Sequence, residues 1–143
     1  MGSEMCIRDR TNFFHFNVDL AQGPCVIKRL RGCGAGCEYV AITPEGDIYP
    51  CHQFVGNEDY KLGSLYDGTF DKELSGRFAG LNIYTREECR DCWARFYCSG
   101  GCSASNLLVN GDIKKPHRVG CELERKRLEC AIALRAIAAG MAE

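Results

Sequence analysis

The chain has 143 residues, with 18 Lys or Arg, 19 Asp or Glu and a formal net charge of −1. This balance favours neither a nucleic-acid surface nor a membrane surface, and no apolar run of about 18 or more residues predicts a transmembrane helix. The sequence does not begin with a charged segment followed by an apolar stretch, so it predicts no signal peptide. The length fits one domain, and the outlying residue type is cysteine, with 11 copies.

The first half of the chain predicts little regular structure apart from one hairpin. Residues 1–10 show neither periodicity nor a helix cap and resemble a cloning or assembly remnant, so we exclude them from fold reasoning. Residues 11–20 partly alternate and predict a short strand. After a glycine-rich turn at 32–36, the apolar segments 39–42 and 47–49 flank a turn with Pro and Gly, which predicts a β-hairpin.

The second half of the chain predicts several helices. Helical segments are expected at 71–78, 103–109 and 122–139, and the last is rich in Leu, Ala, Glu and Arg. Thr85 and Glu88 have the spacing of a capping box, which predicts a short helical turn before the next cysteines. We therefore expect a small, loop-rich α+β domain with one β-hairpin, short helices and a longer C-terminal helix.

The cysteines could form disulfides in a secreted protein or bind metal in a cytosolic one. Their number is odd, and several lie two to five residues apart. Residues that close rarely make good disulfide pairs, but they can converge on one metal centre. We therefore expect metal ligation in the cytoplasm rather than a disulfide scaffold.

The most specific motif is Cys89-x2-Cys92-x5-Cys98-x3-Cys102, followed by Cys121. Two residues between thiols let both sulfurs reach one metal, and five such cysteines with others upstream exceed one tetrahedral site. Two sites are therefore expected.

Iron–sulfur clusters are favoured over zinc at these sites. A zinc ribbon pairs two CxxC knuckles, whereas one occurs here, and a cluster is wider than a single ion and tolerates uneven spacings. Glycines beside the sulfurs offer N–H groups to cluster sulfides: Gly32, Gly34, Gly100, Gly101 and Gly120. The alternative is a non-enzymatic zinc-binding interaction module.

With Cys33-x12-Gly46-x4-Cys51 placed before this motif, the chain resembles the full signature of SPASM domains. These are C-terminal extensions of radical SAM enzymes that modify peptides and proteins. The resemblance covers about Cys25 to Cys121. The segments GPCVIKRLRGCGAG and ITPEGDIYPCHQFVG are further similar to the maturases of six-cysteine (SCIFF) peptides, which form thioether cross-links.

The resemblance implies two auxiliary [4Fe-4S] clusters with interleaved ligands. The implied ligands of the second cluster are Cys89, Cys92, Cys98 and Cys121. Those of the first are Cys33, Cys51 and Cys102. The fourth ligand of the first cluster could be Cys25, Cys37 or a substrate thiolate, or one iron could be left open.

A radical SAM core needs CxxxCxxC, and Cys33-x3-Cys37 is followed by Val40 where the third cysteine would stand. We therefore expect a C-terminal part that is inactive alone, with S-adenosylmethionine bound only by a missing N-terminal core. Residues 11–24 are expected to end that core, 25–122 to form the iron–sulfur domain and 122–143 the C-terminal helix. The expected partners are that core and a cysteine-rich precursor peptide, with no nucleic acid and no membrane.

Overall fold

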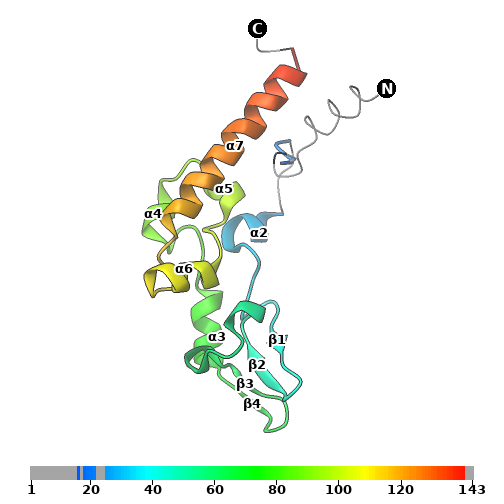
Figure 1. Cartoon of the computed structure of the whole chain (residues 1–143), viewed down its shortest axis with the longest axis vertical. Helices are drawn as coiled ribbons and strands as arrows, with labels where there is room; N and C mark the ends of the chain where they lie inside the picture. The colour runs from blue at the N-terminus through cyan, green and yellow to red at the C-terminus, as the bar shows by residue number, and fades with distance from the viewer. Residues whose placement is uncertain (1–15, 17, 22–24, 141–143) are drawn as a thin grey trace, which may run out of the picture.

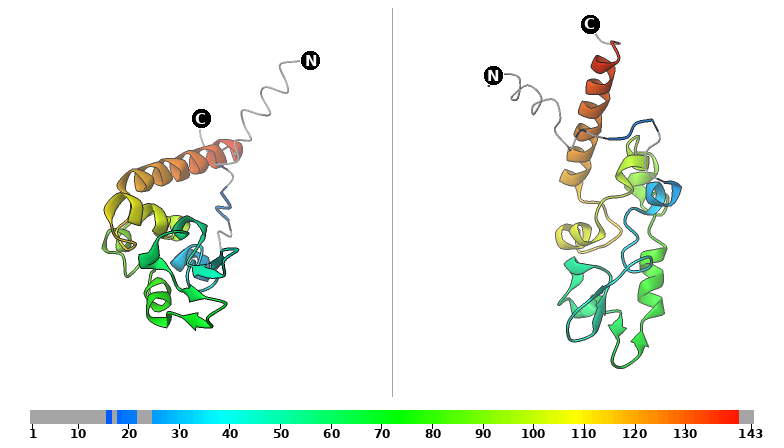
Figure 2. Two further views of the ribbon diagram at one scale, coloured as in Figure 1. Left: turned by 60° about the horizontal axis from the view of Figure 1, so that its bottom comes forward. Right: turned by 90° about the vertical axis from the view of Figure 1, so that its right-hand side faces the viewer.

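The computed structural model describes residues 16, 18–21 and 25–140. The molecule is elongated, with a small sheet at one end, the longest helix projecting from the other and shorter helices between them (Figures 1 and 2). The predicted α+β fold is confirmed. Residues 1–10 and most of the strand predicted at 11–20 lie outside the described residues. The described part of that segment contains no strand.

The sheet is an antiparallel meander in the order β1-β2-β3-β4. Its strands are β1 (Ala41–Ile42), β2 (Asp47–Tyr49), β3 (Gly63–Ser64) and β4 (Thr69–Phe70). The predicted hairpin is β1–β2, closed at a turn where Gly46 has φ 83° and donates its N–H to Thr43 O at 2.9 Å. Strands β3 and β4 extend this hairpin. The sequence does not predict them, because each has only two residues and therefore shows no alternation of apolar and polar side chains.

Six α-helices and two 3₁₀ turns make up the rest of the described fold. The α-helices are α2 (Val26–Arg31), α3 (Lys72–Ala79), α4 (Glu87–Arg90), α5 (Arg95–Cys98), α6 (Ser103–Asn110) and α7 (Arg118–Ala138). The 3₁₀ turns are η2 (His52–Phe54) and η3 (Glu58–Tyr60). Local chemistry explains the ends of the predicted helices: Asp71 Oδ1 accepts the Leu74 N–H at 2.8 Å before α3, and Gly111 with φ 71° ends α6. No described helix combines the length and the apolar character needed to cross a membrane.

The hydrophobic core lies between the sheet and α3. Phe54 is 2% exposed, and its ring meets the ring of Phe78 edge-on at a centroid distance of 5.4 Å. Leu62, which precedes β3, is fully buried in the same cluster. Cys51 belongs to this cluster as well, so the core fixes one of the predicted ligands.

Two predicted helix starts are wrong. Thr85 does not cap α4: its hydroxyl accepts the Asn82 N–H at 2.9 Å and donates to Gly80 O at 2.9 Å, which closes a turn before the helix. The N-cap is instead Arg86, which makes no side-chain cap. The last helix begins at Arg118, directly after His117 and ahead of the predicted start at residue 122, so Cys121 lies within its first turn.

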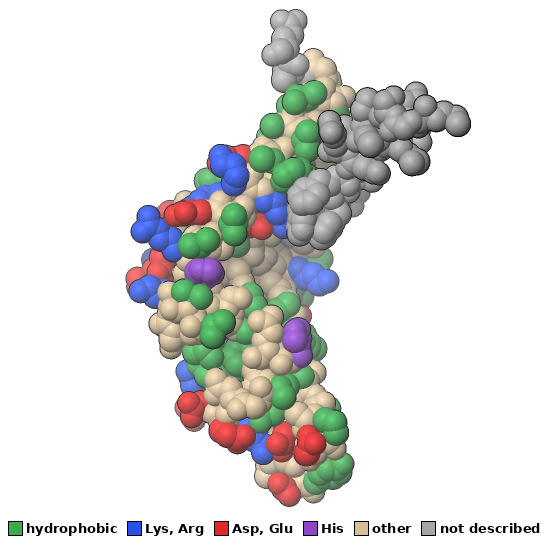
Figure 3. Space-filling model, in the orientation of Figure 1, with side chains coloured by type: hydrophobic (Ala, Val, Ile, Leu, Met, Phe, Trp, Pro, Cys, Tyr) green, Lys and Arg blue, Asp and Glu red, His purple; other side chains and the backbone are tan. Residues whose placement is uncertain are grey.

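Charge is unevenly distributed along the molecule. Figure 3 shows acidic side chains gathered at the end that carries the sheet, while most basic side chains lie toward the helical end. The ion pair of Lys61 with Asp47, at 2.7 Å, offsets part of this acidic excess beside β2.

Candidate metal centres

The predicted cysteine ligands lie within or next to helices and strands from both halves of the chain. Cys33 follows α2, Cys51 follows β2, and Cys102 directly precedes α6. The others come from the helical half: Cys89 in α4, Cys92 just after it, Cys98 at the end of α5 and Cys121 in α7. All ten cysteines that the structure describes are free thiols.

One cavity of about 430 Å³ brings together cysteines from three helical segments. It is lined by Cys89, Cys92, Cys98 and Cys121. Twenty-two residues lie between Cys98 and Cys121 in the sequence, so their meeting at one cavity depends on where the fold places α7. These four cysteines are the predicted ligands of the second cluster.

The thiols of this group influence one another electrostatically. Burial raises the pKa of Cys89 to about 11; the positive charge of Arg86 opposes this rise, and Cys98, Cys121 and Cys92 add to it. Burial likewise raises the pKa of Cys121, with Arg125 opposing it and Cys92 adding to it. Crowded thiols resist ionising together unless positive charge enters among them. Iron ions supply that charge when they bind thiolates.

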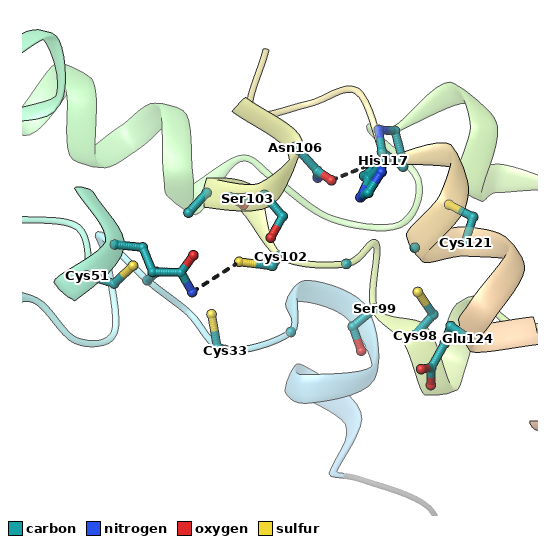
Figure 4. A pocket seen from close by; sticks show the side chains of 18 of the residues that line it. Cys33, Cys51, Cys98, Ser99, Cys102, Ser103, Asn106, His117, Cys121 and Glu124 are labelled. Carbon is teal, nitrogen blue, oxygen red and sulfur yellow. Dashed lines mark hydrogen bonds between the residues drawn. The ribbon is translucent and has the colours of Figure 1, made fainter. Parts of the chain in front are cut away.

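A second cavity, of about 610 Å³, adjoins the first. It is lined by Cys33, Cys51 and Cys102, and it reaches Cys98 and Cys121 as well. Figure 4 shows the sulfurs of Cys33, Cys51 and Cys102 turned toward one another, with those of Cys98 and Cys121 forming a separate group. The three former residues are the predicted ligands of the first cluster.

Two polar side chains point at the sulfurs of this first group. The Tyr39 hydroxyl donates to Cys33 Sγ at 4.0 Å, and Gln53 Nε2 donates to Cys102 Sγ at 3.9 Å. Burial raises the pKa of Tyr39 to about 12, and the neighbouring Cys33 and Cys51 add to the rise. Hydrogen bonds to cluster sulfurs help set cluster potentials, so both side chains are suited to that role.

The two candidates for the fourth position of the first cluster lie elsewhere. Cys25 is exposed at the N-terminus of α2. Cys37 is also exposed, and its thiol donates to Gly34 O at 3.4 Å. Neither residue lines the cavity that holds Cys33, Cys51 and Cys102.

The loop from Cys98 to Cys102 joins the two cavities. Its three inner residues, Ser99, Gly100 and Gly101, all have positive φ, at 59°, 86° and 72°. Glycine adopts this conformation without strain, and Ser99 is held in it by its hydroxyl, which donates to Lys28 O at 2.6 Å. The backbone groups of Gly100 and Gly101 both lower the pKa of the Cys98 thiol, against the rise that burial causes, and the Gly101 N–H donates to Cys98 O at 3.2 Å.

The predicted glycine donors are therefore only partly available. The backbone of Gly100 and Gly101 lies beside Cys98 and lowers the pKa of its thiol. The Gly32 N–H instead donates to Lys28 O at 3.0 Å, where it ends α2. A helix end uses its glycine N–H internally, which a sequence pattern of glycines beside cysteines does not reveal.

The donor set suits a bulky, thiolate-bound group. The cysteines line cavities of several hundred cubic ångströms, and the backbone groups of Gly100 and Gly101 lie close enough to Cys98 to lower its pKa. Thiolates around a cavity, with N–H donors beside them, are what a protein offers an iron–sulfur cluster.

Sequence reasoning missed three side chains beside these sites: Tyr39, Gln53 and Arg86. Tyr39 reads as a strand residue of the hairpin, and Gln53 follows a motif cysteine without any pattern of its own. Arg86 lies in the charged segment 85–88, which reads as an exposed helix start, yet it is 3% exposed. Only the packing of distant segments over it removes it from solvent.

Comparison with known proteins agrees with this reading of the cysteines. Residues 33–93 match the SPASM family, an iron–sulfur cluster-binding domain. The matched stretch contains Cys33, Cys51, Cys89 and Cys92, and the other three predicted ligands follow it.

Several curated proteins are similar over most of the chain. An uncharacterized protein of Archaeoglobus fulgidus is 31% identical over 101 residues, covering 68% of this chain and 24% of its own. A serine-type anaerobic sulfatase-maturating enzyme of Klebsiella aerogenes is 27% identical over 107 residues, covering 67% of this chain and 25% of its own. A PqqA peptide cyclase of Xanthomonas axonopodis is 31% identical over 84 residues, which cover 55% of this chain and 22% of the cyclase.

The chain thus spans about a quarter of the length of these curated relatives. The resemblance to SPASM domains, first drawn from the cysteine spacing, is confirmed by the family match. Within residues 33–93, this chain is therefore similar to SPASM domains, a family of iron–sulfur cluster-binding domains.

Proposed function

We propose that the chain binds two auxiliary [4Fe-4S] clusters as the C-terminal part of a cytoplasmic radical SAM enzyme that forms thioether cross-links in a ribosomally made, cysteine-rich peptide. The carrying observation is the pair of adjoining cavities, one lined by Cys89, Cys92, Cys98 and Cys121, the other by Cys33, Cys51 and Cys102. In this proposal residues 11–24 end the radical SAM core, and S-adenosylmethionine binds to that core.

The relatives support a peptide or protein substrate for the whole enzyme. One is named as a sulfatase-maturating enzyme and others as peptide cyclases. The thioether chemistry rests on the resemblance of the segments around Cys33 and Cys51 to SCIFF maturases.

When bound, the first cluster would hold a thiol of the peptide or accept an electron as the carbon–sulfur bond forms, and the second would be structural or relay electrons. Neither Cys25 nor Cys37 lines the cavity that holds Cys33, Cys51 and Cys102, and we therefore favour a peptide thiolate as the fourth ligand of the first cluster. The residues of this chain then have two tasks. Cys33, Cys51 and Cys102 hold the site at the cavity wall, and Tyr39 and Gln53 direct hydrogen bonds to its sulfurs.

The test of cluster binding is anaerobic reconstitution followed by measurement of iron, sulfide and zinc. About eight irons and eight sulfides per chain are expected for two [4Fe-4S] clusters. Stoichiometric zinc without sulfide would instead establish the zinc-binding interaction module. If the chain isolated under air has neither free thiols nor bound metal, it is a disulfide scaffold instead.

The test of the thioether chemistry uses the full-length parent, with its N-terminal core. The reading frame upstream should encode CxxxCxxC. Incubated with S-adenosylmethionine, a reductant and a cysteine-rich peptide, the parent should remove a pair of hydrogens per cross-link, and alkylation should no longer modify the linked cysteine. A modified peptide whose cysteines all remain alkylatable would refute thioether formation while leaving cluster binding intact.

A further inference from the structure

Arg86 is a buried cation without a carboxylate partner. The residue is 3% exposed. Its Nη1 donates to Ile113 O at 2.6 Å and to Lys114 O at 2.8 Å, and its Nη2 donates to Ser103 Oγ at 3.1 Å. These acceptors are all neutral, and none of the ion pairs among the described residues includes Arg86. Because burying a charge without a counter-charge is costly, the fold needs negative charge nearby.

The guanidinium lies directly behind the wall of the cavity that holds the second group of cysteines. Gly100 lines that cavity, and a Cβ built on Gly100 would lie 2.8 Å from both Cδ and Nε of Arg86. The backbone of the same Gly100 lies close enough to Cys98 to lower the pKa of its thiol, against the rise that burial causes. Arg86 therefore packs against a glycine that lines the cavity of the candidate ligands.

The Nε–H group of Arg86 also shows that the hydrogen-bonding capacity of this side chain is not fully used. This atom is buried and has no hydrogen-bond partner among the protein groups around it. Cys89, Asp112, Cys98 and Glu88 are the groups whose negative charge would act on Arg86. Neither carboxylate forms an ion pair with it, whereas Cys89 and Cys98 would carry negative charge as ligands of a bound cluster.

We propose that Arg86 is the buried counter-ion of the second cluster, which favours cluster loading and raises the cluster's reduction potential. This inference rests on the proposed function, in which Cys89, Cys92, Cys98 and Cys121 hold that cluster. Four thiolates give the loaded site a net negative charge, and water is too scarce around Arg86 to screen the attraction. A fixed positive charge beside the site stabilises the reduced form, which carries one more electron, more than the oxidised form.

Arg86 also ties together three chain segments, and the test must separate its charge from that structural role. Its hydrogen bonds join the start of α4 to the 113–114 loop and to Ser103 at the start of α6. Arg86→Lys keeps the positive charge but cannot reach all three acceptors, whereas Arg86→Gln loses the charge. Arg90→Gln is the matched control, because Arg90 is one turn further along and exposed, with a single hydrogen bond to Tyr84 O at 3.4 Å.

The measurement uses the full chain in which Cys33 and Cys102, both exposed, are replaced by Ala so that only the second site remains. After anaerobic reconstitution, iron and sulfide are quantified and the reduction potential is followed by electron paramagnetic resonance. With Arg86 intact, about four irons and four sulfides are expected. Zinc without sulfide at this stage would refute the proposed function itself, and this inference with it.

With the site loaded, Arg86→Gln is expected to shift the potential to more negative values or to abolish loading, while Arg86→Lys and Arg90→Gln stay near the parent. Full loading of Arg86→Gln at an unchanged potential would overturn the proposal. So would an Arg86→Lys protein that loses loading, or shifts in potential, as much as Arg86→Gln does. In that case the shape and hydrogen bonds of the guanidinium, and not its charge, are what the site needs.

Discussion

Replacing Gly100 by Ala is expected to destabilise the loaded domain by dislodging Arg86. Gly100 has φ +86°, and the added Cβ would lie 2.8 Å from Cδ and Nε of Arg86. That separation is too short for non-bonded atoms, so the arginine side chain has to move. It cannot move freely, because its Nη1 is held by the carbonyls of Ile113 and Lys114 at 2.6 and 2.8 Å.

The size of the effect follows from two contributions. An Ala held at positive φ costs about 1–2 kcal/mol. Losing one hydrogen bond from a charged, buried donor costs about 1.5–3 kcal/mol more. Gly111→Ala is the matched control, since Gly111 also has positive φ, +71°, but no atom lies within 4 Å of its Cβ position. The two variants should therefore differ by about 1.5–3 kcal/mol, the part that belongs to Arg86.

The assay is thermal unfolding of the anaerobically reconstituted chain, followed by circular dichroism and by the visible absorption of the clusters. Because cluster loss makes unfolding irreversible, the midpoints are compared at one scan rate. For a domain of this size, roughly 3–5 °C of midpoint is expected per kcal/mol. Equal midpoints for Gly100→Ala and Gly111→Ala would refute the idea that Arg86 is clamped behind the cavity wall.

Three further predictions concern the clusters. Cys92→Ala should remove about half of the iron and sulfide, because it deletes one ligand of one site, and Cys130→Ala should remove none; full content in the Cys92 variant would disprove its assignment as a ligand. Tyr39→Phe should keep both clusters but lower the reduction potential of the first, because the hydroxyl beside Cys33 Sγ is lost. Tyr66→Phe is the control, since the Tyr66 hydroxyl donates to Pro44 O at the sheet end. A potential unchanged by Tyr39→Phe would exclude this role of Tyr39. Removing iron with a chelator should destabilise residues 86–121 more than the sheet. Amide exchange should then be faster in these residues than around the core of Phe54 and Leu62. Uniform protection after iron removal would show that the fold does not depend on the clusters.

Local sequence signals predicted the elements whose determinants are local. The hairpin followed from apolar segments around a turn in which Gly46 adopts positive φ. Helix α6 ends at Asn110 before Gly111, and α3 begins after the Asp71 cap, both close to the expected ranges 103–109 and 71–78. Each depends on residues within a few positions of one another, and such signals survive in an isolated sequence.

The helix start at α4 shows where local reading fails. Thr85 and Glu88 have the right spacing for a capping box, but Thr85 closes a turn with Asn82 and Gly80 instead. The turn puts Arg86 at the cap position and directs its side chain inward, toward acceptors 27 and 28 residues along the chain. No pattern near residue 86 announces those acceptors.

The spacing of the cysteines, by itself, determined the family and the kind of ligand this protein offers, because a CxxC and its neighbours are constraints within one short segment. Only the tertiary structure decided which thiols face which cavity. It brings Cys121, from the first turn of α7, to Cys89, Cys92 and Cys98, and it leaves Cys25 and Cys37 outside the cavity that Cys33, Cys51 and Cys102 line. It also decided that Arg86 is buried beside the second group. Contacts between distant segments arise from packing, and packing is a property of the whole chain.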